Sequence, residues 1–124
     1  MPARRNTQQR AAIFHALEST GRPLTAEQIH AEAKRRARGL GIATVYRNLR
    51  TMVDEGRLVT VELPGEPSRY EMAGKEHHHH FVCERCDRVF EIDVCASNLE
   101  DMIPKGFVLE RHEVILYGCC ADCR

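Results

Sequence analysis

Two Cys-x-x-Cys pairs constrain this chain more than any other feature. They are Cys83–Cys86 and Cys120–Cys123, with 33 residues between the inner cysteines. Zinc prefers four thiolates in a tetrahedron, and each Cys-x-x-Cys turn supplies two of them at the right reach. The spacing therefore predicts a structural zinc ion that joins the two segments. A redox dithiol is the weaker alternative, and the neighbouring Cys119 could compete as a ligand.

The composition indicates the setting in which these thiols act. The chain has 124 residues, enough for one ordinary domain or two very small ones. Six cysteines would suit a secreted disulfide scaffold, but the basic and polar start lacks the apolar run of an export signal. No run approaches the ~20 apolar residues of a membrane span. We therefore expect a soluble, cytoplasmic protein whose cysteines bind metal, with no membrane partner.

The net charge of zero hides an uneven distribution. Residues 1–60 hold 11 Lys and Arg against 5 Asp and Glu, whereas residues 61–124 hold 7 against 13. A basic half joined to an acidic half rich in His and Cys suggests a polyanion-binding module linked to a cation-binding module. Two solvated surfaces of unequal charge would give the same totals.

The first half has the pattern of three short helices and a hairpin. Helical spacing of apolar residues occurs in Thr7–Ser19, in a segment opened by Thr25 and ended by Gly39, and before Gly56. After Gly56 the period becomes that of strands, over 58–63 and 68–72, with a Pro-Gly turn between them. A hairpin behind three such helices predicts a winged helix-turn-helix.

The stretch ATVYRNL begins the third predicted helix, whose first turn would enter the major groove of DNA. The candidate contacts to bases and phosphates are Ala43, Thr44, Tyr46 and Arg47. Arg47 is the strongest of them because a guanidinium binds guanine or phosphate bidentately. Arg4 and Arg5, on a start that we expect to be flexible, could reach phosphates or the minor groove. A helical bundle that binds no nucleic acid fits the same pattern.

The second half is predicted to be a separate small domain. The expected boundary gives domains of residues 1–73 and 74–124. The expected elements are strands over 80–83 and 88–92, a helix over 96–103 and a strand over 107–117. Together with the winged helix this makes an α+β protein with a small α/β domain at its end. So short a domain buries little apolar area, which favours stabilisation by metal and by a partner subunit.

Four consecutive histidines, His77 to His80, precede the first Cys-x-x-Cys pair. Alternate residues of a strand face opposite sides, so the run predicts two pairs of ligands on two faces. Glu71 and Glu91 could complete a site with the pair His78 and His80. His112 and Glu100 could complete a second site with the pair His77 and His79. A polar strand start with adventitious metal affinity is the alternative.

The motifs ATVYRNL, HHHHFVCERC and HEVILYGCCADC, in this order around a wing, resemble the ferric uptake regulator family of bacterial metalloregulators. The resemblance spans Thr7–Cys123 and implies a dimeric winged-helix repressor of a double-stranded DNA operator, without a small organic substrate. By this resemblance the structural zinc ligands are Cys83, Cys86, Cys120 and Cys123. The regulatory ligands are Glu71, His78, His80 and Glu91, and a further site of some members falls on His77, His79, Glu100 and His112. Tyr46, Arg47 and Arg5 match the DNA contacts.

The chain departs from the family pattern in ways that bear on the metal. Pro23 stands where iron- and peroxide-sensing members usually place a histidine, and His79 replaces an aspartate of their His-His-Asp-His run. A regulatory site of two nitrogens and two oxygens suits tetrahedral Zn²⁺, whereas Fe²⁺ or Mn²⁺ would want five or six ligands. We therefore expect a zinc-responsive repressor of metal homeostasis. An iron-, manganese- or peroxide-responsive regulator is the alternative within the family.

A metal storage or chaperone protein is the alternative from another functional class. The basic recognition helix would then have no role. An enzyme is not expected, because no catalytic base, nucleophile or open zinc position is evident in the sequence. A metallo-hydrolase would need a zinc ion with a water position and a general base beside it.

Overall fold

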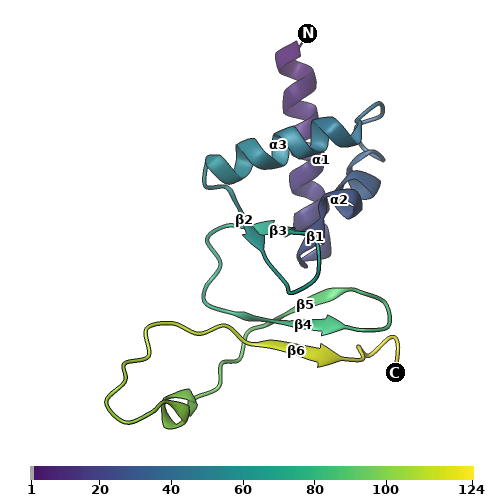
Figure 1. The fold of residues 1–124 in the computed structure, drawn as a ribbon. Coiled ribbons are helices and arrows are strands. Elements are labelled where there is room, and N and C mark those ends of the chain that lie inside the picture. The colour runs from purple at the N-terminus through teal and green to yellow at the C-terminus, as the bar shows by residue number, and fades with distance from the viewer. Residues whose placement is uncertain (1) are drawn as a thin grey trace. The chain divides into compact units, whose positions relative to one another are not determined.

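The structure is a computed structural model that describes residues 2–124, with side chains described from Arg4 onward. The chain divides into two compact units, one reaching to Lys75 and the other running from Glu76 to Arg124. Each unit contains one three-stranded sheet, and the helices α1 to α3 all belong to the N-terminal unit (Figure 1). None of the helices in residues 2–124 is long and apolar enough to cross a membrane.

The N-terminal unit is built on α1 (Pro2–Thr20), α2 (Ala26–Ala33) and α3 (Ile42–Asp54). Thr25 caps α2 as the sequence predicts: its hydroxyl accepts from the Gln28 backbone N–H, and the Gln28 side chain accepts from the Thr25 N–H. This capping box satisfies two amides that the first helical turn leaves unpaired. Gly56, with φ of 76°, ends α3 in the left-handed conformation that glycine adopts without strain.

Two helix boundaries differ from those predicted. The first helix begins at Pro2 and not at Thr7, because the fixed φ of proline suits the first turn of a helix. Arg4 and Arg5 therefore lie on a helix, and the prediction of a flexible start is wrong. The second helix ends at Ala33, and the chain continues to Gly39 as turns in place of helix.

The core of this unit lies where the three helices meet. Its fully buried side chains include Ile13 from α1, Ile29 from α2, and Leu49 and Met52 from α3. On α2 and α3 the buried side chains have helical spacing, and on α1 they include Ala12, Ile13 and Leu17, whereas Ala11 is exposed.

The wing is an antiparallel sheet of β1 (Leu24–Thr25), β2 (Leu58–Val61) and β3 (Arg69–Met72), in the order β1-β3-β2. The hairpin of β2 and β3 is the predicted one, and the two-residue β1 is too short to leave a pattern in the sequence. Arg69 is buried on β3, and its guanidinium donates to the side chains of Gln28 (3.2 Å) and Glu66 (3.1 Å). The bond to Gln28 joins the wing to the start of α2, whereas the bond to Glu66 lies within the hairpin.

The C-terminal unit is a sheet of β4 (His79–Cys83), β5 (Val89–Ile92) and β6 (Ile115–Gly118), in the order β5-β4-β6. The central strand β4 runs antiparallel to β5 and parallel to β6. The buried residues between Glu76 and Arg124 are His79, Val82, Cys83, Val89 and Cys120. Three of these five carry a group that binds metal, so this unit has little purely apolar core.

Residues 93–114 contain less regular structure than predicted. The helix expected over 96–103 is a single turn of 3₁₀-helix, η1 (Leu99–Met102). The strand expected over 107–117 pairs only from Ile115 to Gly118. Phe107 and Val108 are 68% and 84% exposed, so these apolar residues are left mostly uncovered by the rest of residues 2–124. Their strand-like composition therefore does not produce a strand in the single chain.

Candidate metal centres and nucleic-acid interface

The first turns of α3 present the side chains that the sequence predicts to contact DNA. Val45 and Leu49 are fully buried and hold the helix to the core. Ala43, Tyr46 and Arg47 are exposed on the opposite face, and Thr44 is half-buried. Because α3 begins at Ile42, these residues occupy its first turns, as a recognition helix requires.

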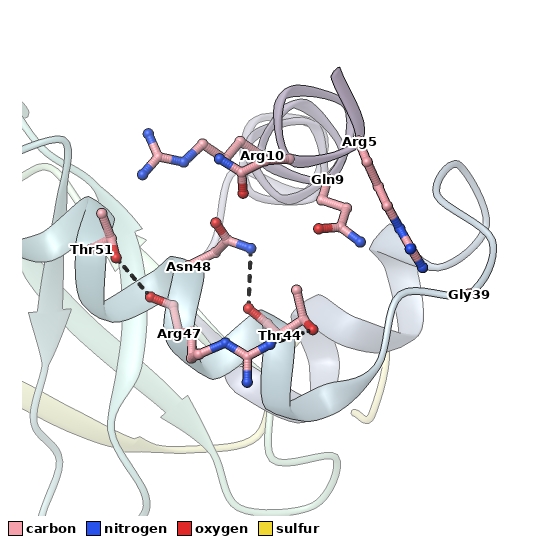
Figure 2. A pocket seen from close by; sticks show the side chains of 9 residues that line it. Arg5, Gln9, Arg10, Gly39, Thr44, Arg47, Asn48 and Thr51 are labelled. Carbon is pink, nitrogen blue, oxygen red and sulfur yellow. Dashed lines mark hydrogen bonds between the residues drawn. The ribbon is translucent and has the colours of Figure 1, made fainter. Parts of the chain in front are cut away.

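A basic cleft of ≈ 500 Å³ lies between α1 and α3 (Figure 2). Its lining residues include three arginines and no acidic residue: Arg5, Asn6, Gln9, Arg10, Gly39, Thr44, Arg47, Asn48 and Thr51. Figure 2 shows Arg5 and Gln9 of α1 across the cleft from Arg47 and Thr44 of α3. Guanidinium and amide donors that line a groove in this way match the oxygens of a nucleic-acid backbone.

Arg10 and Asn48 in this cleft were missed by the sequence analysis. Arg10 donates to Glu55 at 3.2 Å, and the Asn48 side chain donates to the Thr44 carbonyl at 3.1 Å. The helical spacing of the basic and polar residues in α1 could have indicated Arg10. Asn48 follows from no such signal, because it lies on the buried side of α3 beside Leu49.

Tyr46 makes a contact outside its own helix. Its hydroxyl donates to the Glu27 carboxylate on α2, with an O···O distance of 2.7 Å. This hydrogen bond lowers the pKa of Glu27 and, together with the carboxylate charge, raises the pKa of Tyr46. The phenol ring is thereby held in one orientation while 46% of the residue stays exposed.

The two Cys-x-x-Cys pairs come together in the C-terminal unit. Ligand atoms of Cys83, Cys86, Cys120 and Cys123 all lie within 4.8 Å of one another. Cys83 ends β4, and the turn after it is closed by backbone bonds from Cys83 to Arg88 (2.9 Å) and from Asp87 to Cys83 (2.9 Å). Sulfurs bound tetrahedrally to zinc at 2.3 Å lie about 3.8 Å apart. The Sγ atoms of Cys86 and Cys120 are 3.8 Å apart, so the group fits a zinc ion.

The surroundings of Cys83 and Cys86 favour thiolates, whereas the neighbouring sulfurs, that of Cys120 first, raise the pKa of Cys123 to about 12. The backbone N–H of Cys120 donates to Cys83 Sγ at 3.3 Å and lowers the pKa of Cys83 to about 6. Arg88 donates to the sulfurs of Cys86 (3.1 Å) and Cys120 (3.5 Å), and it lowers the pKa of Cys86. Metal binds the deprotonated thiol, so each lowered pKa reduces the cost of proton release at neutral pH. Cys119 lies outside this group and is exposed.

The four histidines divide into the two pairs that strand alternation predicts. The rings of His78 and His80 have centroids 4.9 Å apart, and those of His77 and His79 are 4.5 Å apart. Glu91 lies opposite His80 in the antiparallel register of β4 and β5, and directly opposed residues share one face of a sheet. Glu91 therefore shares this face with the two histidines, but its carboxylate is not part of the close group of ligand atoms to which His78 and His80 belong. Glu71, the remaining predicted ligand, lies on β3 of the N-terminal unit and is 3.9 Å from Lys75 Nζ.

The second pair belongs to a group whose membership differs from the one predicted. His77, His79 and His112 come together, but the fourth member is Cys95. Glu100, which the sequence analysis put in this site, lies on η1 and is not part of the group. Burial lowers the pKa of His79, with a further contribution from His77 and His112, which favours the neutral ring that metal binding requires.

A family model described as the ferric uptake regulator family matches residues 3–117. The chain belongs to the ferric uptake regulator family. This confirms the family, the α+β fold class and the regulatory role that the sequence predicts. Among its relatives, the zinc uptake regulation protein of Mycobacterium tuberculosis is 36% identical over 123 residues, covering 97% of this chain and 95% of that protein.

Solved structures of the family agree in fold. A zinc-bound manganese uptake regulator superposes with a TM-score of 0.77 and 26% identity, over 91% of this chain and 88% of that one. The ferric uptake regulator of Helicobacter pylori, whose structure reveals three functional metal-binding sites, gives a TM-score of 0.70 and 26% identity. That match covers 93% of this chain and 79% of that one. Metal binding is thus common to these relatives, and the cysteine group of this chain has the donors for it.

Proposed function

We propose that this protein is a zinc-responsive repressor that binds operator DNA as a homodimer. The observation that carries the proposal is the separation of its metal donors into chemically different groups. One group in the C-terminal unit is all sulfur, and one face of β4 and β5 carries nitrogen and oxygen donors. A permanent structural metal and an exchangeable sensed metal need such different sites.

The N-terminal unit supports the DNA-binding part of the proposal. Tyr46 and Arg47 are exposed on the first turns of α3, and the cleft beside them is lined by Arg5 and Arg10. Arginines in this position neutralise phosphates, and the start of a helix reads base edges in the major groove. Ala43 and Thr44 complete the proposed contact surface.

The sulfur group is proposed to hold the structural zinc ion. Cys83, Cys86, Cys120 and Cys123 together would join β4 to the segment after β6. When bound, the zinc ion supplies a rigid tetrahedral link between these segments and no chemistry on a substrate.

The regulatory metal is proposed to bind His78, His80 and Glu91 together with Glu71, the set that the family resemblance implies. Two nitrogens and two carboxylate oxygens favour tetrahedral Zn²⁺ over the five or six ligands of Fe²⁺ or Mn²⁺. The 36% identity to a zinc uptake regulation protein points to the same metal.

Dimer formation is supported by exposed apolar side chains in the C-terminal unit. Val94, Met102, Phe107 and Val108 are each at least 68% exposed. Such a concentration of large apolar groups on a small unit is typical of a protein interface. In such a dimer, two recognition helices would read successive major grooves. Coupling of this kind between metal and DNA amounts to about 1–3 kcal/mol in typical cases.

The test uses duplexes selected from a random-sequence DNA pool by the full-length protein in buffered Zn²⁺. We expect enriched duplexes to bind several-fold or more tightly with Zn²⁺ than without it, and Arg47→Ala to lose this binding while retaining the fold and zinc content. The double variant His78→Ala/His80→Ala should keep the zinc ion of the four-cysteine group and lose the metal dependence.

The outcomes separate the alternatives. Binding that responds to Fe²⁺ or Mn²⁺ but not to Zn²⁺ would establish another regulator of the same family. Failure to enrich any duplex under any of the three metals would favour metal storage or transport. Loss of all zinc from the double histidine variant would show that the division into structural and regulatory sites is wrong.

A further inference from the structure

We propose that Cys95 is the fourth ligand of a zinc-type metal site formed with His77, His79 and His112, and that this thiolate makes the site chemically distinct from the other metal sites of the chain. The inference concerns a third group of donors in the C-terminal unit. It is independent of DNA binding, so it can hold or fail separately from the proposed function.

The distances within the group match a tetrahedral site. Nε2 of His77 lies 3.1 Å from Nε2 of His79 and 3.1 Å from Nε2 of His112. Three imidazole nitrogens at 2.0–2.1 Å from zinc would be separated by about 3.4 Å. A movement of a few tenths of an ångström would therefore admit the ion.

The sulfur of Cys95 lies where the fourth ligand of a tetrahedral site would be. Its Sγ is 3.0 Å from Nε2 of His112, 3.3 Å from that of His79 and 3.7 Å from that of His77. A thiolate and an imidazole on one zinc ion lie about 3.6 Å apart. Cys95 is thus close to all three histidines at once, which a single sulfur–histidine hydrogen bond would not require.

The donor set specifies the class of metal. Three imidazoles and one thiolate are borderline and soft ligands that favour Zn²⁺ or Co²⁺ in tetrahedral geometry. Replacement of an expected carboxylate by a thiolate moves the site away from Fe²⁺ and Mn²⁺, which prefer oxygen donors and more ligands. Neighbouring carboxylates on η1, including Glu100, are not among the four donors.

A metal ion bound to these four ligands would connect the start of β4 to both ends of the segment 96–111. His77 and His79 lie at the start of β4, whereas Cys95 and His112 flank a segment of 16 residues whose only regular element is η1. Metal would close both ends of this segment onto β4 and order it by restricting the chain entropy of the loop. Exposed Met102 and Phe107 lie in that segment, so its order determines the surface they present.

Cobalt spectroscopy tests the sulfur ligand directly. The probe is Co²⁺ added to full-length protein that already holds zinc in the four-cysteine site, with zinc content measured throughout. Zinc binds such a site more tightly than Co²⁺ does, so the added ion fills other sites. The His78 and His80 face has no sulfur, so it contributes no thiolate-to-cobalt charge-transfer absorption.

The wild-type chain should show the near-ultraviolet charge-transfer band, Cys95→Ser should lose it, and Glu100→Gln should keep it. Cys95 is exposed, so the serine variant is expected to fold, and its retained zinc content verifies this. Persistence of the band in Cys95→Ser, its absence from the wild type, or its loss in Glu100→Gln would each overturn the proposal.

Alkylation by iodoacetamide provides a second measurement without substitution at the site. Bound Zn²⁺ should slow modification of Cys95 by about tenfold or more, because the sulfur lone pair that attacks the reagent is shared with the metal. Cys119, which is exposed and outside the group, is the internal control, and its rate should not change. Equal protection of both thiols, or of neither, would contradict the assignment.

Discussion

The two units of this protein differ in what stabilises their folds. The N-terminal unit buries a continuous set of aliphatic side chains from three helices, including Ile13, Ile29 and Leu49. The C-terminal unit has five buried residues. Three of them, His79, Cys83 and Cys120, have side chains that can bind metal. The first unit can fold through the hydrophobic effect alone, whereas the second requires ions to hold its segments together.

Removal of the structural metal should therefore have the largest effect, and only on one unit. A strong chelator, or Cys83→Ser, is expected to unfold residues 76–124 while α1 to α3 remain folded. Zinc binding contributes on the order of 10 kcal/mol to the folding of small zinc modules, more than most single side chains contribute. Hydrogen exchange followed by residue would measure the loss of protection in β4, β5 and β6.

The matched control is Cys119→Ser, which changes the neighbour of a predicted ligand without touching the group of four. It should retain zinc and the protection of all three strands. Global unfolding on chelation, with the helices lost as well, would show that the N-terminal unit does not fold by itself.

A core substitution in the N-terminal unit should destabilise that unit and leave the C-terminal unit unaffected. Leu49 is fully buried on α3, so Leu49→Ala is expected to lower the free energy of unfolding of this unit by about 2–5 kcal/mol. Zinc content of the C-terminal unit should not change. Arg50→Ala, on the exposed side of the same helix, is the control and should change stability by less than about 0.5 kcal/mol. Thermal unfolding with zinc analysis on the same samples would test both variants.

The same contrast explains which features the sequence predicts well. In the N-terminal unit the helical spacing, the cap at Thr25 and the stop at Gly56 are local signals, and each appears in the structure. Local signals suffice there because the core is made by repeating periods of apolar residues. The predicted start of α1 was wrong because Thr7 is a residue type that often caps a helix, whereas the helix begins at Pro2, whose fixed φ suits a first turn.

In the C-terminal unit local signals predict less. Two Cys-x-x-Cys pairs and the alternation of four histidines are patterns within a few residues, and the structure groups these side chains accordingly. Cys95 has no paired spacing, and its proximity to His112 depends on how an irregular segment returns to β4. The family resemblance implies Glu100 as the fourth ligand, and only the fold distinguishes its position from that of Cys95.

A change beside the sulfur group, but not in it, should have an intermediate effect. Arg88 donates to the sulfurs of Cys86 and Cys120 and forms an ion pair with Asp122 at 3.1 Å. Four thiolates around Zn²⁺ carry a net charge of −2, which the guanidinium partly offsets. We expect Arg88→Ala to weaken zinc binding by about 10- to 100-fold, the usual cost of losing such a supporting hydrogen bond. Competition with a chromophoric chelator would measure it.

Arg111→Ala is the control for Arg88, because it removes the same charge from an exposed position of the same unit. Equal weakening by both variants would show that the net charge of the unit, and not the hydrogen bonds to sulfur, sets the affinity.

The smallest effect is expected for a polar contact on the surface of the unit that needs no metal. Tyr46 donates to Glu27, and this bond lowers the pKa of Glu27 below its ordinary value of 4.5. A lowered pKa in the folded state means that the contact stabilises above pH 4.5, and that this contribution disappears as the pH falls through the folded value. Tyr46→Phe should return the pKa of Glu27 toward 4.5 in an NMR titration, with little loss of stability because both groups are exposed. Tyr117→Phe in the C-terminal unit should leave it unchanged. A large loss of stability from Tyr46→Phe would mean that the N-terminal unit, too, depends on individual polar contacts, and the distinction between the two units would weaken.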